Sequence, residues 1–151
     1  MATARSCAPC RSRSRWATDD EVREVSAITH THATSCGACA TAVRLARLLI
    51  DGGDPFDATR AVGLDGWADA PESSVRSGGY VLDTLHAAVW CLLNTGSHRD
   101  CALAAVNLGA DTDTTAAVAG ALAGIAYGAD SIPRVWIGAL RGKDVIDACL
   151  F

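Results

Sequence analysis

The stretch from Ala116 to Gly128 limits the possible folds more than any other part of the sequence. It carries no charged residue, and Gly120, Gly124 and Gly128 recur at four-residue spacing, so they share one face of a helix. With no side chains on this face, we expect another backbone to approach it closely. Thirteen residues are too few to span a bilayer as a helix. The stretch therefore predicts a helix buried in a helical core.

The rest of the chain shows the same kind of periodicity. Apolar residues recur at three- and four-residue steps, and no segment alternates as a half-buried strand would. The sequence Thr18-Asp19-Asp20-Glu21 is typical of a capping box at the start of a helix. The pattern predicts an all-α helical bundle, with further helices near residues 34–50, 56–62, 80–93, 99–108 and 112–127 and one closing helix over 135–151.

Composition and charge limit the class of protein. Half of the 151 residues are apolar and a fifth are charged, which argues against disorder for most of the chain. Residues 1–17 form an Arg/Ser/Cys-rich head that we expect to be disordered, and residues 18–151 form the domain. The net charge is −4, although the first sixteen residues hold four arginines and no acid. The acidic body argues against nucleic acid as a partner.

The cysteines indicate a reducing compartment. Seven cysteines at irregular spacing, with no apolar signal segment, favour free thiols in the cytoplasm and no membrane association. Cys7 and Cys10, with Cys36 and Cys39, leave a structural zinc site as a minor alternative. The second pair lies inside a predicted helix, which disfavours that interpretation.

Asp111 and Asp113 are the main candidates for chemistry. Two carboxylates two residues apart cannot face one ligand from within a regular helix, but they can converge from a loop and the first turn of a helix. Thr114 adds a hydroxyl oxygen at the same end. Such hard oxygen donors suit Mg²⁺, Mn²⁺ or Ca²⁺ rather than zinc. The alternative is that these residues only cap the helix and complement its dipole.

Four segments resemble parts of the ADP-ribosylglycohydrolase family, and they follow one another along the chain as in that family. The most specific is the Gly-Ala-Asp-Thr-Asp-Thr-Thr run at residues 109–115 with its flanks, which is similar to the family signature almost residue for residue. The others resemble the family's Thr-His segment, its Gly-Tyr helix and its closing stretch. The matching segments are 27–32, 77–85 with Trp90 and Asn94, 107–124, and Ile132-Pro133 with Trp136.

The resemblance implies an all-α fold of the ADP-ribosylglycohydrolase type and a centre with two Mg²⁺ or Mn²⁺ ions. It implies a metal-dependent hydrolase that cleaves the glycosidic bond of an ADP-ribose unit on a protein or a small acceptor. Asp111, Asp113 and Thr114 would be metal ligands, and His30 and Tyr80 would contact the substrate. Without the resemblance, His30 is as readily a capping or packing residue, and Tyr80 a core residue.

One departure from the family pattern changes the expectation for this chain. The N-terminal halves of full-length members supply an early Gly-Asp segment, the catalytic glutamate and a Thr-Asp-Asp ligand block, and none of these precedes Thr18. The sequence Thr18-Asp19-Asp20 lies too close to His30 and fits a capping box better. We expect a truncated chain with half of the metal ligands and no assignable catalytic residue.

Two alternatives follow from that expectation. A separate chain could supply the missing half of the hydrolase. The chain could instead be a catalytically inactive remnant that binds ADP-ribose or serves as a structural module.

Overall fold

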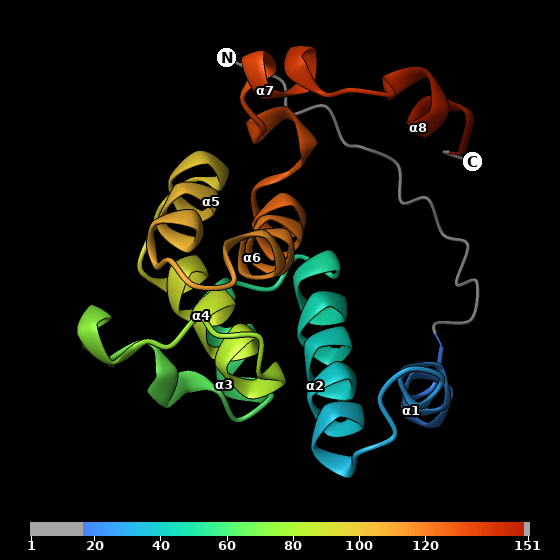
Figure 1. Ribbon diagram of the computed structural model, residues 1–151. Coiled ribbons are helices and arrows are strands. Elements are labelled where there is room, and N and C mark those ends of the chain that lie inside the picture. The colour runs from blue at the N-terminus through green and yellow to red at the C-terminus, as the bar shows by residue number, and fades with distance from the viewer. Residues whose placement is uncertain (1–16, 150–151) are drawn as a thin grey trace, which may run out of the picture.

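The computed structural model describes residues 17–149, and every regular element in that range is helical (Figure 1). The predicted all-α class is therefore confirmed. The disorder predicted for the head at residues 1–17 concerns residues that, apart from Ala17, lie outside the described range. The α-helices are α1 (Asp19–Ala27), α2 (Ala33–Ile50), α3 (Pro55–Ala61), α4 (Val81–Leu93), α5 (His98–Asn107), α6 (Thr112–Tyr127), α7 (Arg134–Ala139) and α8 (Lys143–Cys149), with short 3₁₀ turns at Asp65–Trp67, Glu72–Ser74 and Ala129–Ser131.

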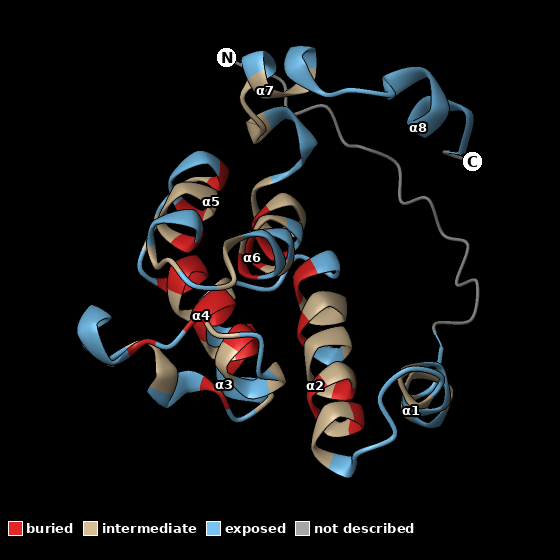
Figure 2. Ribbon diagram, viewed as in Figure 1, coloured by how far each residue is buried: buried red, intermediate tan, exposed pale blue. Residues whose placement is uncertain are grey.

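The core lies where α2, α4, α5 and α6 meet. Helix α6 packs against the other three, and buried residues concentrate on the sides of the helices that face one another (Figure 2). Ala119 and Ala123 of α6 are fully buried, as are Val89 and Leu92 of α4. Alanine lets the helix axes come close, while the larger side chains of α4 fill the remaining space. Helix α6 thus lies in the core as predicted from its composition, but only along one side, since Ala117 and Ala121 are exposed.

The glycine face of α6 is occupied in a different way from the one expected. The imidazole of His98, the first residue of α5, lies 4.0 Å from the positions that Cβ atoms on Gly120 and Gly124 would take. The same ring lies 6.2 Å, between centroids, from the ring of Trp136. No backbone of another helix comes within 4 Å of those two positions. The expected backbone approach was wrong, because the space left by the glycines holds a histidine ring.

Helices α1 and α2 pack against each other at one side of the bundle (Figure 1). Helix α1 begins with the predicted capping box, in which the Glu21 amide donates to the Thr18 hydroxyl and the Thr18 amide donates to the Glu21 carboxylate. It packs mainly on α2, which in turn contacts α4 and α6. Helix α2 is long and apolar enough to cross a membrane by length and composition alone, a property that core helices of soluble proteins share.

The long connection between α3 and α4 is held to α4 by side chains of that helix. The indole N–H of Trp90 donates to the Ala70 carbonyl at 2.8 Å. The Asn94 amide donates to the Ala68 carbonyl at 3.1 Å. These bonds satisfy carbonyl groups of a segment that has little regular structure of its own. The connection is thereby fixed on the same helix that begins at the candidate site.

The single closing helix expected over residues 135–151 is wrong. Two short helices, α7 and α8, occupy this part of the chain and are separated by residues 140–142. Leu140 is extended and Gly142 has a φ of 68°, a left-handed conformation that glycine adopts without steric cost. Both helices lie away from the core, and they expose Val135 and Val145 (Figure 1).

Leu92 tests the core assignment. It is 1% exposed, so replacement by alanine should lower the free energy of unfolding by about 2–5 kcal/mol, because apolar burial is lost and a cavity remains. The exposed Val145→Ala serves as the control and should change it by less than about 0.5 kcal/mol. Urea denaturation followed by circular dichroism measures both. Equal midpoints for the two variants would contradict the packing described here.

The buried cysteines should be unreactive in the folded chain. Burial raises the pKa of Cys91 to about 12 and that of Cys101 to about 11, and only the thiolate is a nucleophile. At pH 8, iodoacetamide should therefore modify the exposed Cys149 and leave both of these thiols intact until urea unfolds the chain. Peptide mass spectrometry reads each site separately. Modification of Cys91 at the rate of Cys149 under native conditions would show that the core is open.

Candidate functional site

The loop before α6 places Asp111 at the start of that helix. Gly109 has a φ of 79° and Ala110 a φ of 53°, so the chain turns sharply and enters the helix at Asp111. Asp111 occupies the N-cap position, yet its side chain makes no capping hydrogen bond. The interpretation of this carboxylate as a cap is therefore wrong. Its oxygens are not consumed by the amide groups of the first turn.

The charged form of the Asp113 carboxyl is favoured by its surroundings at the start of α6. Hydrogen bonding to the Asp111 side chain lowers the pKa of Asp113 most, and the backbone amides of Thr114 and Asp113 lower it further. Asp113 therefore interacts with the exposed amides of the first turn, whereas Asp111 interacts with Asp113. Hydrogen bonding to these groups therefore favours the ionised form of Asp113 at the start of α6.

A groove of about 850 Å³ lies beside this helix start. Three of the residues predicted to form the site, His30, Tyr80 and Thr114, line it together although they are far apart in the sequence. Asp111 and Asp113 do not line the groove, although they directly precede Thr114 in the sequence. The other lining residues come from α1, α2, α4 and α6 and from the turns beside these helices. They are Val25, Ser26 and Thr29 of α1 and its turn, Thr31, His32, Thr34, Ser35, Ala38, Cys39 and Ala42 at α2, Gly79, Val81, Thr84 and Leu85 at α4, and Val118 of α6.

The two histidines at the turn between α1 and α2 have different roles. His32 is the N-cap of α2, and its Nδ1 accepts a hydrogen bond from the Thr34 amide at 3.2 Å. The exposed His30 interacts through Nδ1 only with the hydroxyl of its neighbour Thr29, at 2.9 Å. The capping alternative considered for His30 therefore describes His32 instead. The Nε2 atom of His30 forms no hydrogen bond with another described residue.

Tyr80 precedes α4 and does not belong to the core. It is 54% exposed, and its side chain makes no capping bond with the helix that it begins. The core interpretation of Tyr80 is therefore wrong. In the first turn of α4, the carboxylate of Asp83 accepts from Arg76 at 3.2 Å, so this acid is engaged in an ion pair.

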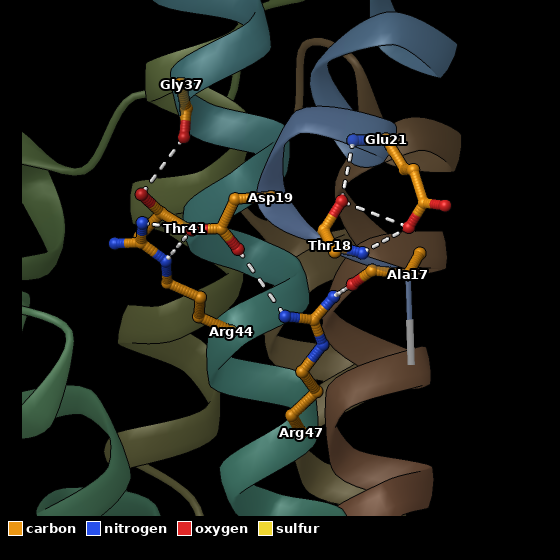
Figure 3. Close-up of polar contacts among 8 residues, drawn as sticks. All are labelled: Ala17, Thr18, Asp19, Glu21, Gly37, Thr41, Arg44 and Arg47. Atoms are coloured by element: carbon orange, nitrogen blue, oxygen red, sulfur yellow. Dashed lines mark hydrogen bonds and ion pairs between the residues drawn. The ribbon is translucent and has the colours of Figure 1, made fainter. Parts of the chain in front are cut away.

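The side chains of Thr18 and Asp19 form hydrogen bonds within α1 and between α1 and α2 (Figure 3). The Asp19 carboxylate accepts from Arg44 Nε at 2.6 Å, with a second contact to the same guanidinium, and from Arg47 at 3.4 Å. Hydrogen bonding to Arg44 is the main reason that the pKa of Asp19 lies below its usual value. This acid connects α1 to α2, which is the structural role expected for the block.

No group of three or more His, Cys, Asp and Glu residues gathers to hold a metal ion within residues 17–149. Cys36 and Cys39 lie on α2, where Cys36 is buried and Cys39 receives a hydrogen bond from Ser26 at 3.4 Å. Cys7 and Cys10 fall outside the described residues. The donors at the start of α6 are thus two carboxylates and the Thr114 hydroxyl, a set whose chemistry suits Mg²⁺ or Mn²⁺ and which is too small to enclose either.

The sequence did not identify Ser77 and Gly79 as neighbours of Asp111. The Asp111 amide donates to the Ser77 carbonyl at 2.9 Å, and the Ser77 hydroxyl donates to the Gly109 carbonyl at 2.8 Å. A Cβ on Gly79 would lie 3.1 Å from Asp111 Oδ2. Both residues belong to the segment that resembles the Gly-Tyr helix, but no spacing in the sequence indicates that it lies against residues 109–111.

Comparison with known proteins identifies relatives of this chain. The family model described as ADP-ribosylglycohydrolase matches residues 5–150. An ADP-ribosylarginine hydrolase, Tri1, of Serratia proteamaculans is 41% identical over 80 residues, which are 53% of this chain and 22% of the relative. The ADP-ribosyl-[dinitrogen reductase] glycohydrolase of Rhodospirillum rubrum is 35% identical over 120 residues, 77% of this chain and 41% of the relative. The chain thus spans less than half the length of these relatives.

The match also bears on the boundary proposed from the sequence. It begins at residue 5 and so includes most of residues 1–17, which were assigned to a separate head. The division of the chain at residue 17 stays a prediction.

The titration of Asp113 tests the geometry of the two carboxyl groups. Its folded-state pKa is lowered, so ionisation stabilises the folded chain above the ordinary aspartate pKa of about 3.9, and this stabilisation is lost as the pH falls through the folded pKa. Carboxyl ¹³C chemical shifts followed from pH 7 to 2 should give a midpoint for Asp113 below about 3.9. Asp113→Asn assigns the resonance. A midpoint above that value would mean that Asp111 and the two amides do not stabilise the carboxylate.

Proposed function

Since the chain belongs to the ADP-ribosylglycohydrolase family, we propose that it forms part of a metal-dependent centre that hydrolyses the glycosidic bond of an ADP-ribose unit. Asp111, Asp113 and Thr114 bind a divalent cation, Mg²⁺ or Mn²⁺. His30 and Tyr80 contact the ADP-ribose in the groove. The proposal places this activity in the cytoplasm, in keeping with the free cysteines.

The convergence of Thr114, His30 and Tyr80 on one groove carries this proposal. These residues come from three separate segments, and packing of α2, α4 and α6 brings them together. The groove volume of about 850 Å³ is in the range of small-molecule sites, and its surface is mostly apolar although eight lining residues carry a hydroxyl and two an imidazole. Such a groove suits a nucleoside, which has an apolar base and a ribose rich in hydroxyls.

The donor set fits the proposed cation in chemistry. Asp111 leaves its carboxylate uncommitted to the helix, and Asp113 is held in its charged form by Asp111 and two amides. Thr114 follows directly and faces the groove. A bound divalent cation supplies a Lewis acid that orients ribose hydroxyls and water. The chain's own part is to present oxygen ligands at one end of the groove.

The groove residues determine how the substrate is held in this proposal. Tyr80 offers a half-exposed aromatic face to a base or a ribose. His30 offers a ring nitrogen to a hydroxyl or a phosphate oxygen, because its Nδ1 already interacts with Thr29. No lysine or arginine lines the groove, so a diphosphate there requires a cation or backbone amides to compensate its charge. This requirement favours dependence on a divalent cation.

The relatives suggest the acceptor for the first assay. Tri1 of Serratia proteamaculans is named for ADP-ribosylarginine, and the Rhodospirillum rubrum relative is named for dinitrogen reductase, a protein acceptor. We therefore propose a protein bearing ADP-ribosylarginine as the substrate. A small molecule that carries ADP-ribose is the second substrate class to test.

A second function belongs to a different class, a module that binds ADP-ribose without cleaving it. The observation that favours it is the size of the donor set. Two carboxylates and one hydroxyl give weak divalent-cation binding, because affinity follows ligand number and charge. In this case ADP-ribose binding depends on His30 and Tyr80 and is only weakly sensitive to Asp111. Another chain that contributes further ligands would convert the module into the hydrolase.

Asp111→Ala and Asp130→Ala form the matched pair that tests the proposal. Both remove one carboxylate, but Asp130 is exposed in the turn after α6, at the opposite end of that helix. Mn²⁺ binding is measured by the loss of the free-ion electron paramagnetic resonance signal. Release of ADP-ribose from an ADP-ribosylarginine protein is measured in the same buffer. Asp111→Ala should weaken Mn²⁺ binding and slow release by at least about 10-fold, and Asp130→Ala should do neither.

The outcomes separate the two functions. Release that requires Asp111 supports the hydrolase. ADP-ribose binding seen by calorimetry, lost in His30→Ala and Tyr80→Ala but with no release, supports the binding module. If the parent chain neither binds Mn²⁺ nor releases ADP-ribose, and Asp111→Ala behaves as the parent, the metal-dependent centre proposed for this chain is wrong.

A further inference from the structure

The segment before α4 and the loop before α6 are joined by one residue, Ser77. Its carbonyl accepts from the Asp111 amide at 2.9 Å, and its hydroxyl donates to the Gly109 carbonyl at 2.8 Å. The Ser77 side chain is 4% exposed. A single buried serine thus interacts with both ends of the three-residue stretch that leads into α6. The other backbone hydrogen bonds of this stretch join it to residues 106 and 115, whereas the two bonds of Ser77 join it to a distant segment.

The backbone of that stretch needs such support. Gly109 and Ala110 both have positive φ, and Ala110 is the one non-glycine residue between positions 17 and 149 that does. A residue with a Cβ is unfavourable in this region, because Cβ lies close to the backbone carbonyl. Conformations of this kind persist when surrounding contacts hold them. The two hydrogen bonds of Ser77, on either side of Ala110, provide such contacts.

The same segment also limits where the Asp111 carboxylate can lie. A Cβ built on Gly79 would be 3.1 Å from Asp111 Oδ2, which is closer than ordinary packing allows. The carboxylate therefore uses space that any other residue at position 79 would fill. Gly79 has no positive φ, so its backbone does not require glycine. Glycine at position 79 therefore leaves room for the Asp111 carboxylate and is not required by the backbone conformation.

We propose that Ser77 and Gly79 are positioning residues for Asp111. Ser77 holds the backbone from which the carboxylate projects, and Gly79 leaves the space that the Oδ2 atom of this carboxylate needs. This inference rests on the proposed function, in which Asp111 and Asp113 bind one divalent cation. Two carboxylates bind a cation well only when their separation and direction are fixed beforehand, and here the fixing element comes from a segment more than thirty residues away in the chain.

A purely structural role for Ser77 gives different expectations. A serine that only satisfies its own buried hydroxyl would affect stability and leave the Asp111 carboxylate where it is. The segment has a further tie on its α4 side, where the Thr84 hydroxyl donates to the Gly78 carbonyl at 3.3 Å. Loss of the Ser77 hydroxyl should therefore loosen residues 109–111 while the segment stays attached to α4. Local readouts at Asp111 distinguish the two roles.

The chain offers a matched control in Ser74. Its hydroxyl also donates to a carbonyl, that of Pro71 at 2.8 Å, but it is exposed and this bond lies within its own turn, with no link to residues 109–111. The variants are Ser77→Ala, Ser77→Thr, Gly79→Ala and Ser74→Ala. The first removes a hydroxyl at the proposed positioning residue, and the last removes one with the same type of bond elsewhere. Gly79→Ala moves only the flexible end of the Asp111 side chain, by a few tenths of an ångström, so the fold should be unchanged.

The experiment combines hydrogen exchange at the Asp111 amide with Mn²⁺ titration followed by electron paramagnetic resonance. Ser77→Ala should speed exchange of the Asp111 amide and weaken Mn²⁺ binding by about 10-fold, the effect expected when support of a metal ligand is lost. Ser77→Thr should restore both, because its hydroxyl replaces the lost donor. Gly79→Ala should weaken Mn²⁺ binding without changing the exchange rate. Ser74→Ala should match the parent in both measurements.

Each result decides between the inference and the function on which it rests. If the parent binds Mn²⁺ through Asp111 and Ser77→Ala binds it equally well, the positioning role is wrong and the proposed function stands. Unchanged exchange at the Asp111 amide in Ser77→Ala overturns the role of Ser77 whatever the metal result. A parent chain that does not bind Mn²⁺ overturns the proposed metal centre and the positioning role with it.

Discussion

Burial of α6 against α2, α4 and α5 is the constraint on which the rest of the structure depends. Ala119 and Ala123 are fully buried on this helix, and small side chains there let three neighbours approach one axis. Removing this apolar surface from water stabilises the bundle in proportion to the area buried. Because α6 begins directly after Asp111, the packing that buries its middle also determines where its first turn lies. The candidate site is therefore a consequence of the core.

Helical periodicity divides the polar run at the start of α6 between two functions. Consecutive residues of a helix differ by about 100° in direction, so neighbours in sequence face different surroundings. Thr114 lines the groove, whereas Thr115 is fully buried with its hydroxyl unpartnered. Thr115 therefore belongs to the core in spite of its polarity. Two adjacent threonines of the same polar run thus differ in their surroundings, one at the groove and one in the core.

The elements that the sequence predicted well are those with strong local signals. Helices α4 and α6 were located within about one residue, because apolar spacing and flanking turn residues act locally. The closing helix was wrong because its division depends on Gly142 between Arg141 and Lys143, whose left-handed conformation ends one helix before the next begins. The glycine face of α6 was recognised, but its occupant was not. A histidine on another helix fills it, and sequence spacing does not identify tertiary partners.

The same distinction explains which parts of the candidate site were accessible to sequence reasoning. Asp111 and Asp113 attract attention by their spacing, and their resemblance to a family indicates a role. The contacts that orient them come from Ser77 and Gly79, whose importance appears only once α4 and α6 pack side by side. In the proposed centre, the identity of the ligand residues is thus encoded locally, while the direction of their carboxylates is encoded by the tertiary fold. A chain could keep the acidic run and still lose the site, because one hydroxyl or one added methyl group more than thirty residues earlier changes where the carboxylate points.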